Sequence, residues 1–149
     1  MKKKNGEKLH VWQPDMTLKG KNPSEIVMEE VACKPDSLTI IFKDFYSNRI
    51  KIVYDQECPL EYVVWSFRYG TEIGRSDLSR LDQDFSFLNS DESPYFFKVS
   101  NSSYIKSFDN NHIANKQLYP TVEHHLYLTG DDVFEVISNY EPKIIKYYG

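Results

Sequence analysis

Short runs of alternating apolar and polar residues constrain the fold of this chain more than any other feature of its sequence. The stretches SLTIIF (37–42) and RIKIVY (49–54) are rich in β-branched residues, and KDFYSN between them ends on an asparagine suited to a turn. This pattern predicts an antiparallel β-hairpin. Within its second strand, Ile50, Ile52 and Tyr54 share one face because side chains alternate along a strand.

The longest strand candidate is LEYVVWSFRY, residues 60–69. One of its faces is almost wholly apolar and should look into the core; it carries Val63, Trp65, Phe67 and Tyr69. Arg68 lies on the other face, four residues before Glu72. We expect a local ion pair between these two residues, and the alternative is a polar feature at the edge of a binding surface.

Further strands are expected at residues 95–100 (YFFKVS), 103–108 (SYIKSF) and 121–128 (TVEHHLYL). The stretch EIVMEEV (25–31) fits a strand or a short helix, and the strand is the better match. In the polar segment that follows Gly70, Ser76 could cap a short turn of helix, and the rest reads as a loop.

A C-terminal helix is expected over residues 131–140. The apolar residues Val133, Val136, Ile137 and Tyr140 follow the spacing of an amphipathic helix. Thr129 is then the N-cap, Asp132 stands at the acidic position of a capping box, and Asp131 also favours the positive end of the helix. The predicted fold is α+β: an antiparallel sheet of about six strands with this C-terminal helix packed on it.

Two adjacent histidines, His124 and His125, precede this segment and raise the question of a metal or acid–base site. On a strand, neighbouring side chains point to opposite faces, so the two rings cannot grip one ion together. A metal site would have to recruit His10 or His112 and a carboxylate. The spacing therefore predicts no metal site.

Composition narrows the class of protein. The chain has 149 residues, 15% of them aromatic, and a net charge of −4 from 18 basic and 22 acidic residues. A single domain (1–149) is expected, with residues 1–8 as a flexible tail. There is no basic excess for direct nucleic-acid binding, no apolar run for a membrane span and no export signal. We expect a cytoplasmic protein of unknown oligomeric state.

The sequence also lacks the motifs of common catalytic and cofactor sites. It has no GxSxG nucleophile elbow and no glycine-rich phosphate cradle. Neither Cys33 nor Cys58 stands in a sequence pattern that supplies a nucleophile with its basic partner, so each is expected to be a buried or incidental thiol. No catalytic residue, cofactor or metal is therefore predicted.

A resemblance emerges from the order of the segments. The hairpin SLTIIFKDFYSNRIKIVY is followed by WSFRYGTE and YFFKVSNSSYIKSF, and the chain closes with HHLYLTGDDVFEVISNYEPKI. Over most of residues 37–145 this resembles small cytoplasmic immunity (antitoxin) proteins of Bacillus-type bacteria, which inhibit secreted, contact-dependent toxins. It is similar to the cognate inhibitor of a wall-associated toxin that cleaves tRNA. The resemblance implies a non-enzymatic protein that plugs or masks a toxin domain.

An acidic and aromatic stretch between residues 72 and 95 is the expected partner-binding surface. A toxin that cleaves nucleic acid needs a positive site, so acidic side chains would complement it and an aromatic ring would anchor it. The candidate residues are Glu72, Asp82, Asp84, Asp91, Glu92 and Tyr95. The alternative function is a small-ligand binding protein or an enzyme with an aromatic-lined pocket.

Overall fold

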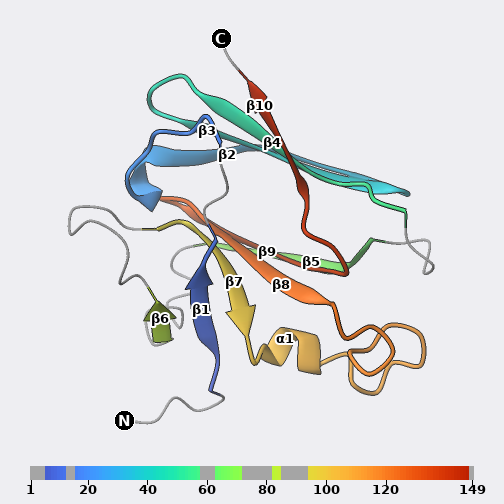
Figure 1. Cartoon of the computed structure of the whole chain (residues 1–149). Coiled ribbons are helices and arrows are strands. Elements are labelled where there is room, and N and C mark those ends of the chain that lie inside the picture. The colour runs from blue at the N-terminus through green and yellow to red at the C-terminus, as the bar shows by residue number, and fades with distance from the viewer. Residues whose placement is uncertain (1–5, 13–15, 58–62, 72–81, 85–93, 148–149) are drawn as a thin grey trace.

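Two β-sheets stack face to face in the computed structural model, which describes residues 6–12, 16–57, 63–71, 82–84 and 94–147 (Figure 1). One sheet has six strands in the order β5-β9-β8-β7-β1-β6, and the other has four in the order β10-β4-β3-β2. Neighbouring strands are antiparallel, apart from the parallel pair β1 and β6. The architecture is a β-sandwich.

The six-stranded sheet consists of β1 (Lys8–Val11), β5 (Val64–Thr71), β6 (Asp82–Asp84), β7 (Phe96–Ser100), β8 (Glu123–Leu128) and β9 (Asp132–Ser138). The four-stranded sheet consists of β2 (Ile26–Lys34), β3 (Ser37–Asp44), β4 (Arg49–Tyr54) and β10 (Lys143–Tyr147). Two short helices complete the described elements, the 3-10 helix η1 (Pro23–Glu25) and α1 (Ser103–Lys106).

The predicted hairpin is confirmed as β3 and β4, which pair antiparallel with Ile40 opposite Ile52. Its turn is closed by the Asp44 carboxylate, whose Oδ1 accepts the backbone N–H groups of Tyr46 and Asn48, each at 2.9 Å. These bonds satisfy a buried carboxylate and two turn amides together. The strands predicted at 25–31, 95–100 and 121–128 are also present, as β2, β7 and β8.

The main core fills the space between the two sheets. Aromatic rings meet there, with Phe42 of β3 lying 5.0 Å from Phe96 of β7 between ring centroids. Burial of these side chains supplies the largest favourable contribution to folding. The fully buried members from the four-stranded sheet are Ile26, Leu38, Ile40, Phe42, Ile50, Ile52 and Tyr54, and they face Phe96, Tyr127, Phe134 and Val136.

The outer face of the six-stranded sheet is covered as well. The helix α1 and the chain that follows it lie under β8 and β9 in Figure 1. Ile105 of α1 packs there against Val122 and Ile137, with Trp65 and Phe108 beside them. Strands β8 and β9 are therefore buried on both faces.

The predicted C-terminal helix over residues 131–140 is wrong, and with it the α+β class. Residues 132–138 form the strand β9, which lies between β8 and β5. All residues from Val133 to Ser138 are buried. A strand covered on both faces shows no apolar–polar alternation, so its apolar residues fit helical spacing by chance.

Thr129 keeps the hydrogen bond expected of a cap, although no helix follows. Its Oγ1 accepts the backbone N–H of Asp132 at 3.0 Å, and its own N–H donates to the Asp132 carbonyl at 2.9 Å. These bonds close the turn between β8 and β9. A threonine hydroxyl can satisfy the amide three residues on in a turn as well as at a helix start.

Three other expectations need correction. Residues 103–106 form α1 rather than a strand, and Lys8, expected in a flexible tail, begins β1. The apolar face predicted for 60–69 reaches the core only in part: Val63 is buried in the main core, whereas Phe67 and Tyr69 are 40% and 57% exposed. A β-bulge between Val64 and Ser66 also shifts the register of this strand. The expected helical turn at Ser76 lies outside the described residues.

We expect Thr129→Ala to lower the free energy of unfolding by about 0.5–1.5 kcal/mol, because the turn loses a side-chain hydrogen bond. Thr129→Ser keeps the hydroxyl and should retain most of the stability. Urea denaturation curves of the two variants and the wild type measure the difference. Equal stability of the alanine and serine variants would show that this bond does not contribute.

Candidate functional site

The two adjacent histidines lie on opposite faces of β8, as the alternation of a strand requires. The His124 ring contacts Ser102 and Glu135 on the outer face, whereas the His125 ring contacts Tyr54 of the opposing sheet. The expectation that the rings diverge is confirmed. Each histidine instead belongs to its own polar network, and these two networks are the first candidate sites.

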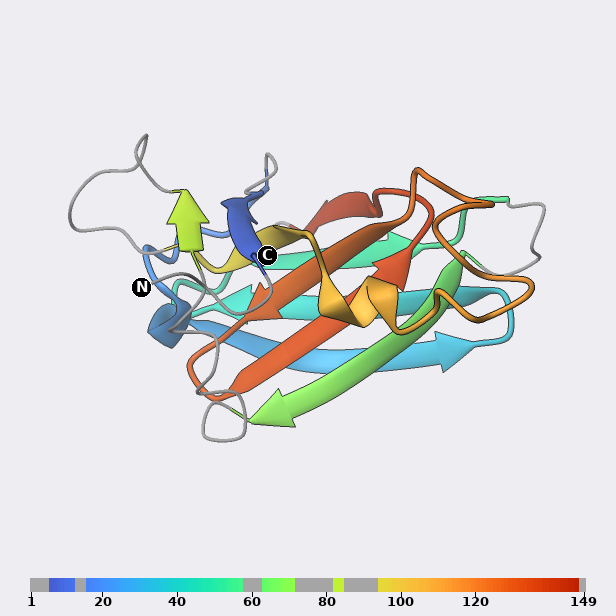
Figure 2. The same cartoon turned by 90° about the horizontal axis from the view of Figure 1, so that it is seen from below.

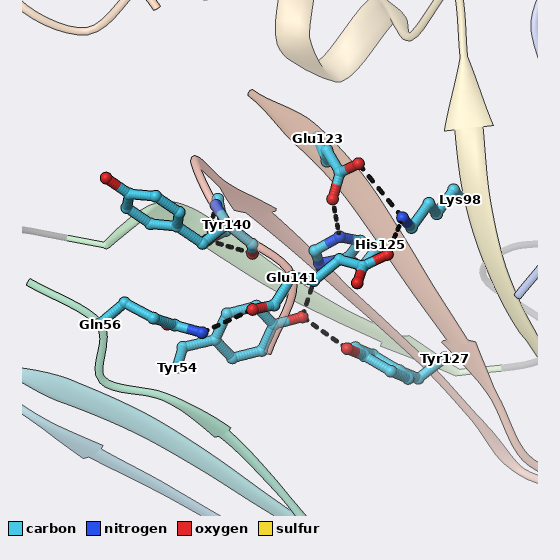
Figure 3. Close-up of polar contacts among 9 residues, drawn as sticks. Tyr54, Gln56, Lys98, Glu123, His125, Tyr127, Tyr140 and Glu141 are labelled. Carbon is cyan, nitrogen blue, oxygen red and sulfur yellow. Dashed lines mark hydrogen bonds and ion pairs between the residues drawn. The ribbon is translucent and has the colours of Figure 1, made fainter. Parts of the chain in front are cut away.

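The inner network joins the two sheets (Figure 3). Tyr54 Oη of β4 lies 2.8 Å from His125 Nδ1 and 2.5 Å from Tyr127 Oη, both on β8. His125 Nε2 lies 3.0 Å from Glu123 Oε1, and Glu123 Oε2 accepts from Lys98 Nζ at 3.2 Å. A line of hydrogen bonds therefore runs from the buried tyrosines to a lysine at the rim.

Burial determines which groups of this network carry a proton. Desolvation lowers the pKa of His125, and the hydrogen bond from His125 is the main cause of a lowered pKa at Glu123. Desolvation raises the pKa of both Tyr54 and Tyr127. A neutral imidazole that donates from Nε2 to Glu123 and accepts the Tyr54 hydroxyl at Nδ1 satisfies these groups together.

The inner network is closed to a substrate. Tyr54, His125 and Tyr127 are fully buried, and Trp12 stacks on the His125 ring with 5.1 Å between centroids. Lys98 lies 5.5 Å from the Trp12 ring and also pairs with Glu141. The arrangement ties the six-stranded sheet to the four-stranded sheet and offers no reacting group to the surface.

The outer network places a serine, a histidine and a carboxylate in line. Ser102 Oγ lies 2.7 Å from His124 Nδ1, and His124 Nε2 lies 2.9 Å from Glu135 Oε1. Arg68 of β5 binds the same carboxylate, with Nε donating to Oε2 at 2.6 Å and an Nη donating to Oε1 at 3.1 Å. The connectivity is that of a hydrolytic triad.

Unlike the triad of a hydrolytic enzyme, this network cannot be reached by a substrate. Ser102, His124 and Glu135 are 4%, 2% and 1% exposed. Ser102 Oγ also accepts the Ile105 N–H at 3.0 Å as the N-cap of α1, and the Tyr104 ring stands edge-on to His124 at 5.5 Å. A nucleophile needs space for a substrate carbonyl about 3 Å away, and packed side chains take that space here.

Arg68 has a different partner from the one its sequence position suggests. The expected partner Glu72 lies outside the described residues, and the guanidinium binds Glu135 on the neighbouring strand β9. It also lies over the Tyr104 ring at 4.2 Å. Register brings these groups together, since Arg68 stands directly opposite Glu135 in the β5–β9 pair. Nothing in the local sequence indicates this partner.

A groove of about 580 Å³ opens between the two sheets on the side of β5. The turn joining β2 to β3 forms one wall, and the first half of β5 forms the other. Its lining includes Cys33, Leu38, Tyr54, Val63, Val64 and Phe67. Figure 2 shows β5, in green, as the outermost strand of its sheet. The volume is in the range of ligand pockets, so the groove is an accessible candidate site.

Three of the six predicted partner-binding residues lie outside the described residues. Glu72, Asp91 and Glu92 are among those not described. Asp82 and Asp84 are the ends of β6, which pairs with β1. Tyr95 is 3% exposed, and its ring meets Phe96 edge-on at 5.1 Å in the core. The expectation that Tyr95 anchors a partner is therefore wrong.

In the described part of the chain, the remaining histidines and the cysteine, which the sequence offered as metal ligands or reactive thiols, do not come together in one site. His10 Nε2 lies 2.8 Å from Ser100 Oγ, and His112 is exposed. Within the described ranges, no three His, Cys, Asp or Glu side chains gather as metal ligands. Cys33 is an exposed free thiol at the groove, and Cys58 lies outside those ranges.

Comparisons with protein-family models, with curated proteins and with solved structures find no match to this chain. In the part of the chain that the structure describes, no helix has the length and apolar character needed to cross a membrane. The function must therefore be inferred from the groove, the strand edges and the networks.

We expect the stability of the wild type to fall as the pH drops below about 6.5, the ordinary pKa of histidine. The unfolded chain binds a proton at His125 that the folded protein resists, so unfolding takes up protons in this range. Loss of stability from Glu123, whose folded pKa is lowered, adds to this at lower pH, below its ordinary value of 4.5.

Chemical denaturation at a series of pH values measures this slope. His125→Gln should flatten the part of it between pH 5 and 6.5, whereas His112→Gln, a change at an exposed position, should leave it as in the wild type. An unchanged slope in the His125 variant would contradict the assignment.

We expect Arg68→Met to lower the free energy of unfolding by about 1–3 kcal/mol, because it removes a bidentate partner from the buried Glu135 carboxylate. The matched control is Arg49→Met, which breaks an ion pair with the exposed Glu29 and should change stability by about 0–1 kcal/mol. Thermal and urea unfolding measure both. Equal effects would mean that water replaces the guanidinium at Glu135.

Proposed function

We propose that this chain is a non-enzymatic, immunity-type protein that binds a cognate toxin domain in the cytoplasm and neutralises it. The proposal rests on aromatic side chains that are exposed at the open side of the sandwich, along β5. There, two aromatic side chains of β5, Phe67 and Tyr69, are 40% and 57% exposed beside the groove. Exposed aromatic residues next to a hollow are typical of protein-binding surfaces.

The closed networks support a binding role over a catalytic one. The described groups with a chemistry useful to an enzyme, such as Ser102, His124 and His125, are buried and hydrogen-bonded within the fold. Buried polar networks of this kind give the fold a single arrangement and a rigid surface. A rigid surface suits an inhibitor, because little ordering is needed when it binds.

The acidic residues predicted from sequence remain part of the proposal. Asp82, Asp84, Asp91 and Glu92, with Glu72, would steer the protein toward a positive nuclease site, and this attraction weakens with salt. Asp82 and Asp84 lie at the β6 edge of the six-stranded sheet, the opposite edge from β5. We therefore assign steering to the acidic residues and anchoring to Phe67 and Tyr69.

A second candidate function is small-ligand binding, which the groove itself favours. Its volume of about 580 Å³ and its lining by Leu38, Val64 and Phe67 suit an apolar molecule. The fluorescence of an environment-sensitive apolar dye, titrated with the protein, tests this candidate. Saturable binding that Cys33→Trp abolishes would place the dye in the groove.

Co-expression tests the immunity function. We expect the wild-type chain to restore growth to cells that produce its cognate toxin domain, which a pull-down against secreted proteins of the source cell would identify. Phe67→Ala/Tyr69→Ala should weaken binding about 10- to 100-fold and speed dissociation, because the variant lacks two anchors. Growth curves and surface plasmon resonance with the purified domain measure the two effects.

The control variant is Ile113→Ala/Leu118→Ala, which truncates two apolar side chains that are 68% and 57% exposed and do not line the groove. It should bind as the wild type does. Circular dichroism must show that each variant is folded. A toxin domain that the wild-type chain neither binds nor neutralises would rule out the proposed function.

A further inference from the structure

Strand β5 forms an edge of the six-stranded sheet. It pairs with β9 on one side, and no strand in the described ranges pairs with its other side. Along Ser66–Gly70, beyond the bulge at Val64–Ser66, this second side carries backbone N–H and C=O groups in the spacing of a β-ladder. Such an edge is a template for one further strand.

The edges of the four-stranded sheet have a different composition. Strand β2 exposes Glu29, Glu30 and Lys34 and contains a bulge between Met28 and Glu30. Charges and bulges on an edge strand oppose pairing with another chain. Strand β10, at the other edge, carries Lys143 and Lys146. These two edges are therefore protected.

Strand β5 also has a bulge, between Val64 and Ser66, but its regular part, Ser66–Gly70, has no bulge and a single charged residue. Its one charged side chain, Arg68, is held by Glu135 on β9 and so is directed back over its own sheet. Phe67 stacks on the core residue Phe134 at 5.4 Å, which places the Phe67 face on the side of the groove. Tyr69 has the same parity and is the more exposed of the two.

The groove lies beside this edge and on one face of it. A strand added to β5 would direct every second side chain toward the space between the sheets, where Cys33, Leu38 and Val64 line the groove. Backbone pairing on an edge then provides affinity, and the hollow beside it selects side chains. The edge and the groove together form one strand-binding surface.

We infer that the partner is held by strand addition: an extended segment of the toxin domain pairs with β5 and inserts alternate apolar side chains into the groove. This inference rests on the proposed function and gives its mode of binding. The occupant is a partner segment with apolar residues at every second position, because the hollow flanks one face of β5 and that face is aromatic.

Hydrogen–deuterium exchange read by NMR distinguishes this mode from contact by side chains alone. The labelled full chain is compared free and in complex with the neutralised toxin domain. In the free protein, alternate amides of Ser66–Gly70 should exchange quickly, and in the complex their exchange should slow by about tenfold or more. The amides of the other edge strands, β2 and β10, should be unchanged.

A groove variant provides a second measurement. Cys33→Trp places a large side chain in the groove from the exposed end of β2 and should weaken toxin-domain binding by about tenfold or more. The control Ile113→Trp adds the same side chain at an exposed residue outside the groove lining and should bind as the wild type does. Circular dichroism controls for folding. The exchange pattern of β5 is measured on the wild type, so it decides the question even where Cys33→Trp fails to fold.

The possible outcomes separate the two proposals. If the chain neutralises the toxin domain and its β5 amides are protected in the complex, both the immunity function and strand addition are supported. Neutralisation with unchanged β5 amides, or with protection at β2 instead, overturns strand addition and leaves the immunity function standing. No neutralisation overturns both. A free protein that is already a dimer with protected β5 amides also overturns the inference, since a second copy would then occupy the edge.

Discussion

Burial of β8 and β9 on both faces is the constraint on which the rest of the structure depends. The four-stranded sheet covers one face, and α1 with the chain after it covers the other. A polar side chain on these strands cannot reach water and must find a partner inside the protein. Tyr54 comes from the opposing sheet to meet His125, and Ser102 and Arg68 come from neighbouring elements to meet His124 and Glu135.

The same constraint explains which elements the sequence predicted. In the β3–β4 hairpin one face is buried and the other is more open, so Ile50 and Ile52 alternate with Arg49 and Lys51, and the period of two is visible. In β9 both faces are buried, so apolar and polar residues no longer alternate. The apolar residues of β9 therefore fit the spacing of a helix, although Val133, Phe134, Val136 and Ile137 are all residue types that favour strands.

The candidate sites were harder to predict for a similar reason. That His124 and His125 diverge follows from alternation alone, and the sequence sufficed for it. Their partners depend on register and on the stacking of two sheets. Tyr54 and His125 are 71 residues apart, and Arg68 and Glu135 are 67 apart. The groove has no local signal at all, because its walls come from β5 and from the turn between β2 and β3.

The placement of the two tryptophans gives each face of the six-stranded sheet its own optical reporter. Trp12 stacks on His125 at the inner network, and Trp65 packs on the outer side with Phe108 at 5.4 Å. Because Trp12 stacks directly on the His125 ring, we expect its emission to report on changes at that ring. Variants that keep one tryptophan at a time would show whether the inner and outer layers separate in a single step or one after the other during unfolding.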